Sequence, residues 1–128
     1  MKYSALIGRI LFSLIFIFSG ISHFAAGTIA YATYAGVPMA SFLVPLSGVI
    51  ALAGGLSIAL GYKAKIGAIL IVIFLLPVTF TMHKFWGITD PMMAQMQMAM
   101  FMKNIALTGG ALVIAAFGSG PLSVDKGV

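Results

Sequence analysis

Apolar positions along this chain form four long runs, and the short segments between them carry most of the charges and several glycines and prolines. The runs cover about 5–26, 39–62, 66–85 and 94–117. Each approaches or exceeds the roughly 20 residues that a helix needs to cross about 30 Å of hydrocarbon. The alternating strands of about 10 residues that build membrane barrels are not visible. The pattern predicts an all-α integral membrane protein, a four-helix bundle formed by a single domain over residues 1–128.

Composition supports a bilayer as the main partner of this chain. Hydrophobic residues make up 62% of the sequence and charged residues 7%, too few to cover a soluble domain of this size. The first run resembles a signal peptide, but Arg9 interrupts it, so we interpret it as the first membrane helix. The segment from Ala26 to Pro38 is expected to be a loop because it contains Gly27 and Gly36 as well as the proline.

Charge distribution predicts the orientation. The net charge is +5, but the basic residues are spread singly, so no nucleic acid partner is expected. Four spans place both termini on one side, which would carry Lys2, Arg9, Lys63, Lys65 and Lys126. By the positive-inside rule this side, with both termini and the turn near residues 61–65, is the cytoplasm. We expect Arg9 to reach that interface as an orientation anchor.

Polar residues within the spans point to a site in the outer half of the bundle. Lys103 lies about 13 Å from the outer start of the last helix near Ala94, at about 1.5 Å per residue. Its side chain either snorkels outward or faces a ligand or a polar cavity. Asn104 follows it, and His23 and His83 lie near the outer ends of the first and third spans. Thr79 is one turn before His83 and is expected to join them. Imidazoles and an ammonium suit the carbonyl and anionic oxygens of a quinone, or another anion.

Copper is the rival cofactor. Six methionines lie within residues 92–102, and thioethers with imidazoles suit copper(I). These methionines are spaced all around the helix and do not form one stripe, a pattern more typical of residues that fill gaps in apolar packing than of copper ligands. The chain has no cysteine, and its two acidic residues lie outside the spans, which argues against a proton-coupled drug exporter. Small residues at Ser47, Ala51 and Gly54, and at Gly48 and Gly55, predict close helix packing, within a bundle or a homo-oligomer.

Several short motifs together resemble the DoxX family of four-helix bacterial membrane proteins. They are Gly-Arg-Ile-Leu at 8–11, Phe-Ser-Gly at 18–20, Ala-Gly-Val-Pro at 35–38, Gly-Gly-Leu at 54–56, Phe-Met-Lys-Asn at 101–104, Gly-Gly at 109–110 and the segment 118–125. The resemblance implies a bundle in the inner membrane and a link to respiratory or sulfur oxidation, including quinone-reducing thiosulfate oxidation, and to redox-stress complexes. The residues that match are Arg9, His83, Lys103 and Asn104.

Two departures from the family pattern affect the site. His23 stands where relatives carry lysine, and Ala51 stands where they often carry glutamate, which removes a natural partner for Lys103. The resulting hypothesis is a redox-associated subunit with a quinone-type pocket formed by His23, His83, Lys103, Asn104 and Thr79. It would depend on a soluble or membrane oxidoreductase partner for electrons. A carrier or channel for a small solute or anion, and a non-catalytic scaffold subunit, stay open, and the residues assign no reaction.

Overall fold

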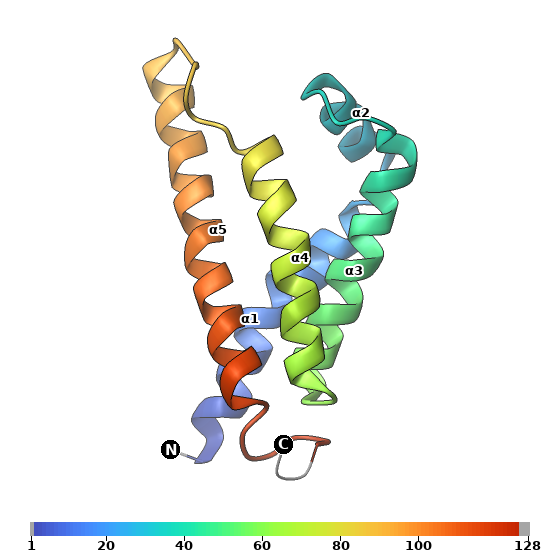
Figure 1. The fold of residues 1–128 in the computed structure, drawn as a ribbon, viewed down its shortest axis with the longest axis vertical. Helices are drawn as coiled ribbons and strands as arrows, with labels where there is room; N and C mark the ends of the chain where they lie inside the picture. Colours follow the sequence, from blue (N-terminus) through green and yellow to red (C-terminus); the bar gives the residue numbers. More distant parts are fainter. Residues whose placement is uncertain (1, 126–128) are drawn as a thin grey trace.

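The protein is described by a computed structural model that covers residues 2–125, within which every regular element is a helix (Figure 1). The five helices are α1 (Lys2–Ser22), α2 (Ala26–Tyr34), α3 (Ala40–Leu60), α4 (Ala64–Met82) and α5 (Pro91–Phe117). All but α2 are long and apolar enough to cross a membrane. The predicted all-α class with four spans is therefore confirmed.

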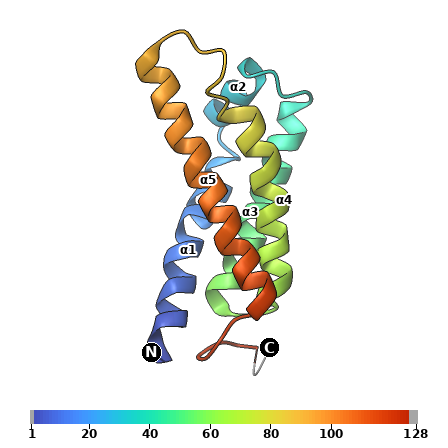
Figure 2. The ribbon, with the colours of Figure 1, turned by 60° about the vertical axis from the view of Figure 1, so that its left-hand side comes forward.

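The four long helices run up and down, so that the start of α1 and the segment after α5 lie at the same end of the bundle (Figures 1 and 2). The tight turn between α3 and α4 lies at that end too, whereas α2 and the loop before α5 lie at the other (Figure 1). We name these the inner and outer ends after the orientation predicted from charge, which stays a prediction. Lys126, one of the residues used for it, is outside the described residues.

Glycines allow α3 to pack closely between α1 and α4. A Cβ added to Gly48 would lie 2.7 Å from the carbonyl oxygen of Gly20 on α1, and one added to Gly54 would lie 2.9 Å from that of Gly67 on α4. The two predicted stripes of small residues thus face different helices. Close backbone approach of this kind is what holds helices together in lipid, where burial of apolar area drives little association.

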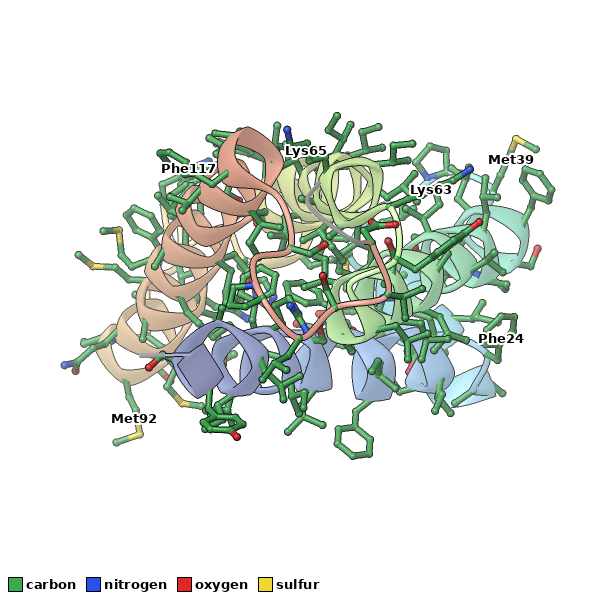
Figure 3. All side chains as sticks on the ribbon, turned by 90° about the horizontal axis from the view of Figure 1, so that it is seen from below. Phe24, Met39, Lys63, Lys65, Met92 and Phe117 are labelled. Atoms are coloured by element: carbon green, nitrogen blue, oxygen red, sulfur yellow. The ribbon has the colours of Figure 1, made fainter. Side chains whose placement is uncertain are left out.

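Two apolar clusters fill the bundle, and its outside is apolar as well. The larger cluster includes Phe16, Ile58, Ile71 and Phe74, and the smaller one joins Ala32 of α2 to the start of α3. Large apolar side chains cover the outer surface of the long helices, and the labelled Phe24, Met39, Met92 and Phe117 point away from the bundle (Figure 3). A surface of this composition fits hydrocarbon rather than water.

The expectation of an irregular loop between Ala26 and Pro38 is wrong, because α2 occupies most of it. Gly27 is in the first turn of α2, where a glycine disrupts little, while Gly36, at φ +92°, and Pro38 follow its end. Ala32 is buried against α3 in the smaller cluster, and this tertiary packing outweighs the local turn signals.

The ends of the long helices also differ from the expected ones by a few residues. α1 ends at Ser22 rather than near Ala26, because Ala25 is extended and begins α2. α5 begins at Pro91 rather than near Ala94. The cause is a cap: a side-chain oxygen of Asp90 accepts a hydrogen bond from the Met92 N–H at 3.0 Å, and proline is favoured at the first helical position.

Candidate ligand-binding site in the outer half of the bundle

Side chains from α1, α2, α4 and α5, and from the residues just after α1 and α4, surround a cavity of about 230 Å³ in the outer half, which we call the polar cavity. α5 leans away from α1 and α3 toward the outer end (Figure 1), while α1 packs on α3, α3 on α4 and α4 on α5. The polar side chains that line the cavity are Ser19, His23, Thr28, His83, Lys103 and Asn104. Its walls are otherwise apolar and include the rings of Phe16 and Phe74. A polar group with a flat apolar ring fits such a lining.

Four of the five predicted site residues line this cavity together, and the fifth does not. Thr79 is 1% exposed, and its hydroxyl has no hydrogen-bond partner among residues 2–125. Although it is one turn from His83, α4 ends at Met82 and His83 has left the helical conformation, with φ −122° and ψ 37°. The two side chains therefore do not share a helix face, and Thr79 lies in the packed interior beside the cavity.

His23 is held at one nitrogen. Its Nδ1 lies 2.5 Å from the carbonyl oxygen of Ser19, one turn earlier in α1, and its ring contacts Phe74 edge-on at 5.5 Å between centroids. Because a carbonyl oxygen only accepts hydrogen bonds, Nδ1 must carry the proton. The tautomer is thereby fixed, and Nε2 is the nitrogen of His23 that stays available to a ligand.

His83 is held in the same way by a different partner. Its Nδ1 lies 2.9 Å from Oε1 of Gln97 on α5. With that oxygen as acceptor, His83 also carries its proton on Nδ1 and keeps Nε2 for a ligand. Gln97 was not among the predicted site residues. Its spacing of seven from Asn104, which places both on one face of α5, is the sequence signal that points to it.

Asn104 is a largely buried polar side chain in the lining of the cavity. It is 4% exposed and lines the cavity, yet its side-chain amide forms no hydrogen bond with any group in the described part of the chain. Its main-chain carbonyl accepts a hydrogen bond from the hydroxyl of Thr108 at 2.8 Å. The amide atoms are not among the fully enclosed unpartnered atoms of residues 2–125, so they stay accessible to a hydrogen-bonding occupant of the cavity.

Lys103 borders the cavity and is exposed on the surface of the bundle. Its Nζ lies 3.6 Å from the sulfur of Met100, three residues nearer the outer end, so the side chain extends outward along α5. The two alternatives for Lys103, snorkelling outward and facing a polar cavity, therefore each describe part of its position. It lines the cavity at the edge, and its ammonium snorkels toward the outer surface.

The ionisable groups around the polar cavity are all basic. Both acidic residues cap helices instead: Asp90 caps α5, and Asp125 accepts a hydrogen bond from the Lys63 N–H at the start of α4. The site thus combines amide and hydroxyl donors and a nearby positive charge with two imidazole acceptors, and no carboxylate lines it. This electrostatic character favours carbonyl or anionic oxygens over cations.

The inner end is closed by Arg9 and the C-terminal segment. The Arg9 side chain is 4% exposed and donates hydrogen bonds to the carbonyl oxygens of Ser119, Pro121 and Leu122. Figure 3, viewed from the inner end, shows the segment after α5 lying across the bundle. Arg9 therefore lies at the predicted end, but it is buried beneath this segment instead of reaching freely into the interface.

Metal binding receives no geometric support from the described residues. Within residues 2–125, no three histidine or acidic side chains come together as a metal site would require. The six methionines of residues 92–102 are exposed around α5, and none of them lines the polar cavity. Copper binding by these thioethers stays a prediction from the sequence.

Comparison with known proteins gives the family. The DoxX family matches residues 4–84 of the chain, which reach from α1 to the end of α4. The chain belongs to the DoxX family. Two similar proteins come from Escherichia coli strain K12. Inner membrane protein YqjF is 32% identical over 94% of this chain and 88% of its own length, and inner membrane protein YphA is 29% identical over 94% of this chain and 87% of its own length. No solved structure matches. Membership and the predicted inner-membrane location are confirmed, and the relatives extend the similarity through most of α5.

Proposed function

We propose that this DoxX protein binds a quinone-type ligand in the polar cavity and serves as a membrane subunit of a redox system. One observation carries the proposal: the unpartnered amide of the buried Asn104 lines the same cavity as the imidazoles of His23 and His83. These groups come from α1, α5 and the end of α4. A cavity with few polar groups aimed inward and apolar walls elsewhere is the usual form of a small-molecule site.

Each polar group has a distinct role toward such a ligand. The Asn104 amide can donate to a ring carbonyl and accept from a ring hydroxyl, so it fits the oxidised and the reduced ligand. The free Nε2 atoms of His23 and His83 can accept hydrogen bonds from hydroxyls, and can hold protons that leave them. Lys103 would stabilise negative charge on a ring oxygen at the outer edge.

A bound quinone would supply the redox chemistry, and a partner oxidoreductase would exchange electrons with it. The chain has no cysteine to exchange them itself. Packing disfavours the carrier hypothesis, because Phe16, Ile58 and Ile71 fill the core of the bundle. Arg9 and the C-terminal segment then close the inner end. A solute path would have to open both.

The sole tryptophan provides a direct test. Trp86 is three residues from His83 and packs against Phe101 at 5.9 Å between centroids, so a quinone in the cavity is expected to quench its fluorescence. Protein in lipid nanodiscs would be titrated with a benzoquinone that carries only methyl and methoxy groups. Asn104→Leu should weaken binding about tenfold, the effect of one lost hydrogen bond of roughly 1.4 kcal/mol.

The matched control is Thr108→Val, one turn along α5. The Thr108 hydroxyl bonds only within its own helix, so this variant should bind like the wild type. If Asn104→Leu and Thr108→Val both show saturable quenching with the same affinity, the result would count against Asn104 as a ligand-binding residue. Absence of saturable binding in the wild type would count against the proposed function itself.

A further inference from the structure

A second, larger cavity lies beside the polar one. It has a volume of about 360 Å³ and lies between α2, α3 and α4, in the outer half of the bundle. We call it the apolar cavity, because most of its lining is aliphatic, including Val44, Ile50, Ile73 and Pro77. The hydroxyls of Ser47 and Thr81, which also line it, are already bonded to carbonyl oxygens of their own helices at 2.7 Å. These hydroxyls therefore make little demand for a polar occupant.

The two cavities share one wall. Five residues line both: His23, Thr28, Phe74, Val78 and Met82. The polar cavity alone, at about 230 Å³, is smaller than the roughly 300–1,000 Å³ of typical small-molecule sites. Adding the apolar cavity brings the combined space well into that range. The shared wall includes Met82, whose unbranched side chain adapts readily to a neighbouring group.

We infer that the two cavities form one site for an amphiphilic ligand, with its polar ring in the polar cavity and its alkyl or prenyl tail in the apolar cavity. This inference rests on the proposed function and narrows the ligand class to quinones with a hydrophobic tail. The chemistry of the two linings differs in the way that the two ends of such a molecule differ. The polar cavity is lined by imidazole and amide groups, whereas the apolar cavity is mostly aliphatic apart from the shared His23 and Thr28 and the bonded hydroxyls of Ser47 and Thr81.

His23 marks the junction between ring and tail. Its ring is fixed by the Ser19 carbonyl and by Phe74, and its Cβ lies against Gly48, where an added Cβ would be 2.7 Å away. The glycine lets α1 approach α3 closely enough to hold the imidazole in the shared wall. His23 thus lines both cavities, with Nε2 as the ring nitrogen that is not engaged by the Ser19 carbonyl.

Filling the apolar cavity separates tail binding from ring binding. The probes are a benzoquinone with a decyl chain and the same benzoquinone with methyl in its place, titrated into protein in nanodiscs. Ser47 lines the apolar cavity and is not one of the five shared residues, so Ser47→Phe is expected to fill the apolar cavity with its ring. It should weaken binding of the decyl compound at least fivefold and leave the methyl compound within twofold of wild type. Thr81→Phe, from the exposed end of the same cavity, should do the same and serves if the first variant fails to fold.

Ala53→Phe is the matched control, because Ala53 is exposed on α3 and lines neither cavity. It should change neither affinity. If both filling variants leave the decyl compound unaffected, or weaken both compounds equally, the tail assignment is overturned while the polar site stands. If the methyl compound fails to bind wild type, the proposed function falls, and this inference with it.

The acyl chain of a bilayer phospholipid has the same chemistry as the quinone tail. A separate experiment must therefore show which of the two occupies the apolar cavity. A phospholipid and a quinone, each with a photoreactive diazirine at the tail end, would be crosslinked to the wild type and the labelled peptides mapped. Labelling near Ile50 or Ile73 by the quinone probe, and its loss when unlabelled decyl quinone is added, supports the inference. Labelling there by the phospholipid alone, unaffected by quinone, would identify a lipid site and overturn it.

Discussion

Arg9 and Ser119 are 110 positions apart, and Nη1 of Arg9 donates a hydrogen bond to the main-chain carbonyl of Ser119 at 2.5 Å. Nη2 donates in the same way to Leu122 at 2.7 Å. The guanidinium therefore links the first helix to the segment after the last one. Its charge is stabilised by carbonyl dipoles, since both carboxylates of the chain are engaged at helix caps.

Arg9→Met should detach the C-terminal segment from the bundle. The substitution removes one charge-assisted hydrogen bond to the buried Ser119 carbonyl, worth roughly 1.5–3 kcal/mol, and two to the exposed Pro121 and Leu122, which water can largely replace. A loss of about 2–4 kcal/mol in unfolding free energy is therefore expected. Denaturant unfolding in mixed micelles would measure it, and limited proteolysis should cut faster after residue 118. Lys65→Met, an exposed cation at the same end, is the control and should alter neither. Equal stability of the two variants would contradict the structural role of Arg9.

Gly48→Ala should force α1 away from α3 and disturb His23. An added Cβ would meet both the Gly20 carbonyl oxygen and the His23 Cβ at 2.7 Å, distances that real contacts do not reach. Overpacking of this kind costs about 1–3 kcal/mol. Thermal unfolding in nanodiscs would report the stability, and quinone titration would report the site. Gly109→Ala is the control, because an added Cβ there meets nothing within 4 Å. It should be neutral or stabilising, and a comparable loss in both variants would contradict the close-packing argument.

Much of this arrangement could be predicted from the sequence, because the apolar runs predict the length of the spans and their alternating direction. Four spans that alternate in direction bring His23, His83 and the outer half of α5 to the same level, which is why these residues with Lys103 and Asn104 line one cavity. Periodicity also placed Gly48 and Gly54 on packing faces. These features depend on helix geometry alone, which fixes position along and around each axis.

Other features depend on contacts that no local pattern encodes. The carbonyls that bind Arg9 belong to main chain and carry no residue signature, so their contact with α1 could not be read from spacing. α2 forms because Ala32 packs on α3, a tertiary effect that opposes the turn signals around it. Thr79 was misplaced because the chain leaves helical geometry at His83. The apolar cavity is the space that side chains of α2, α3 and α4 leave between them, and no local sequence pattern predicts its size or place.

Gln97→Leu should weaken ligand binding by releasing His83. The Gln97 oxygen fixes the proton on Nδ1 of the imidazole, and without it both tautomers and other ring orientations become available. We expect an affinity loss of about three- to tenfold for the hydroquinone form of the methyl compound, whose hydroxyl can donate to Nε2 of His83, the range of a lost neutral hydrogen bond. Nitrogen NMR of the imidazole should show mixed tautomers, which a merely structural role would not produce. Gln95→Leu, an exposed glutamine on the same helix, is the control. An unchanged tautomer in Gln97→Leu would show that another group orients His83.

Lys103→Met should separate charge from packing at the edge of the polar cavity. The lysine is exposed and its nearest polar contact is the sulfur of Met100 at 3.6 Å, so its removal should leave the unfolding free energy within about 0.5 kcal/mol of wild type. Binding should respond differently to two probes, because an ammonium stabilises anionic oxygens much more than neutral ones. A hydroxyquinone that is anionic at neutral pH should lose about tenfold in affinity, and the uncharged methyl benzoquinone should lose less than threefold. Lys84→Met carries the same change on an exposed lysine that lines neither cavity, and it should leave both affinities unchanged. Equal losses for the two probes in Lys103→Met would mean that the side chain affects binding through its shape and not through its charge.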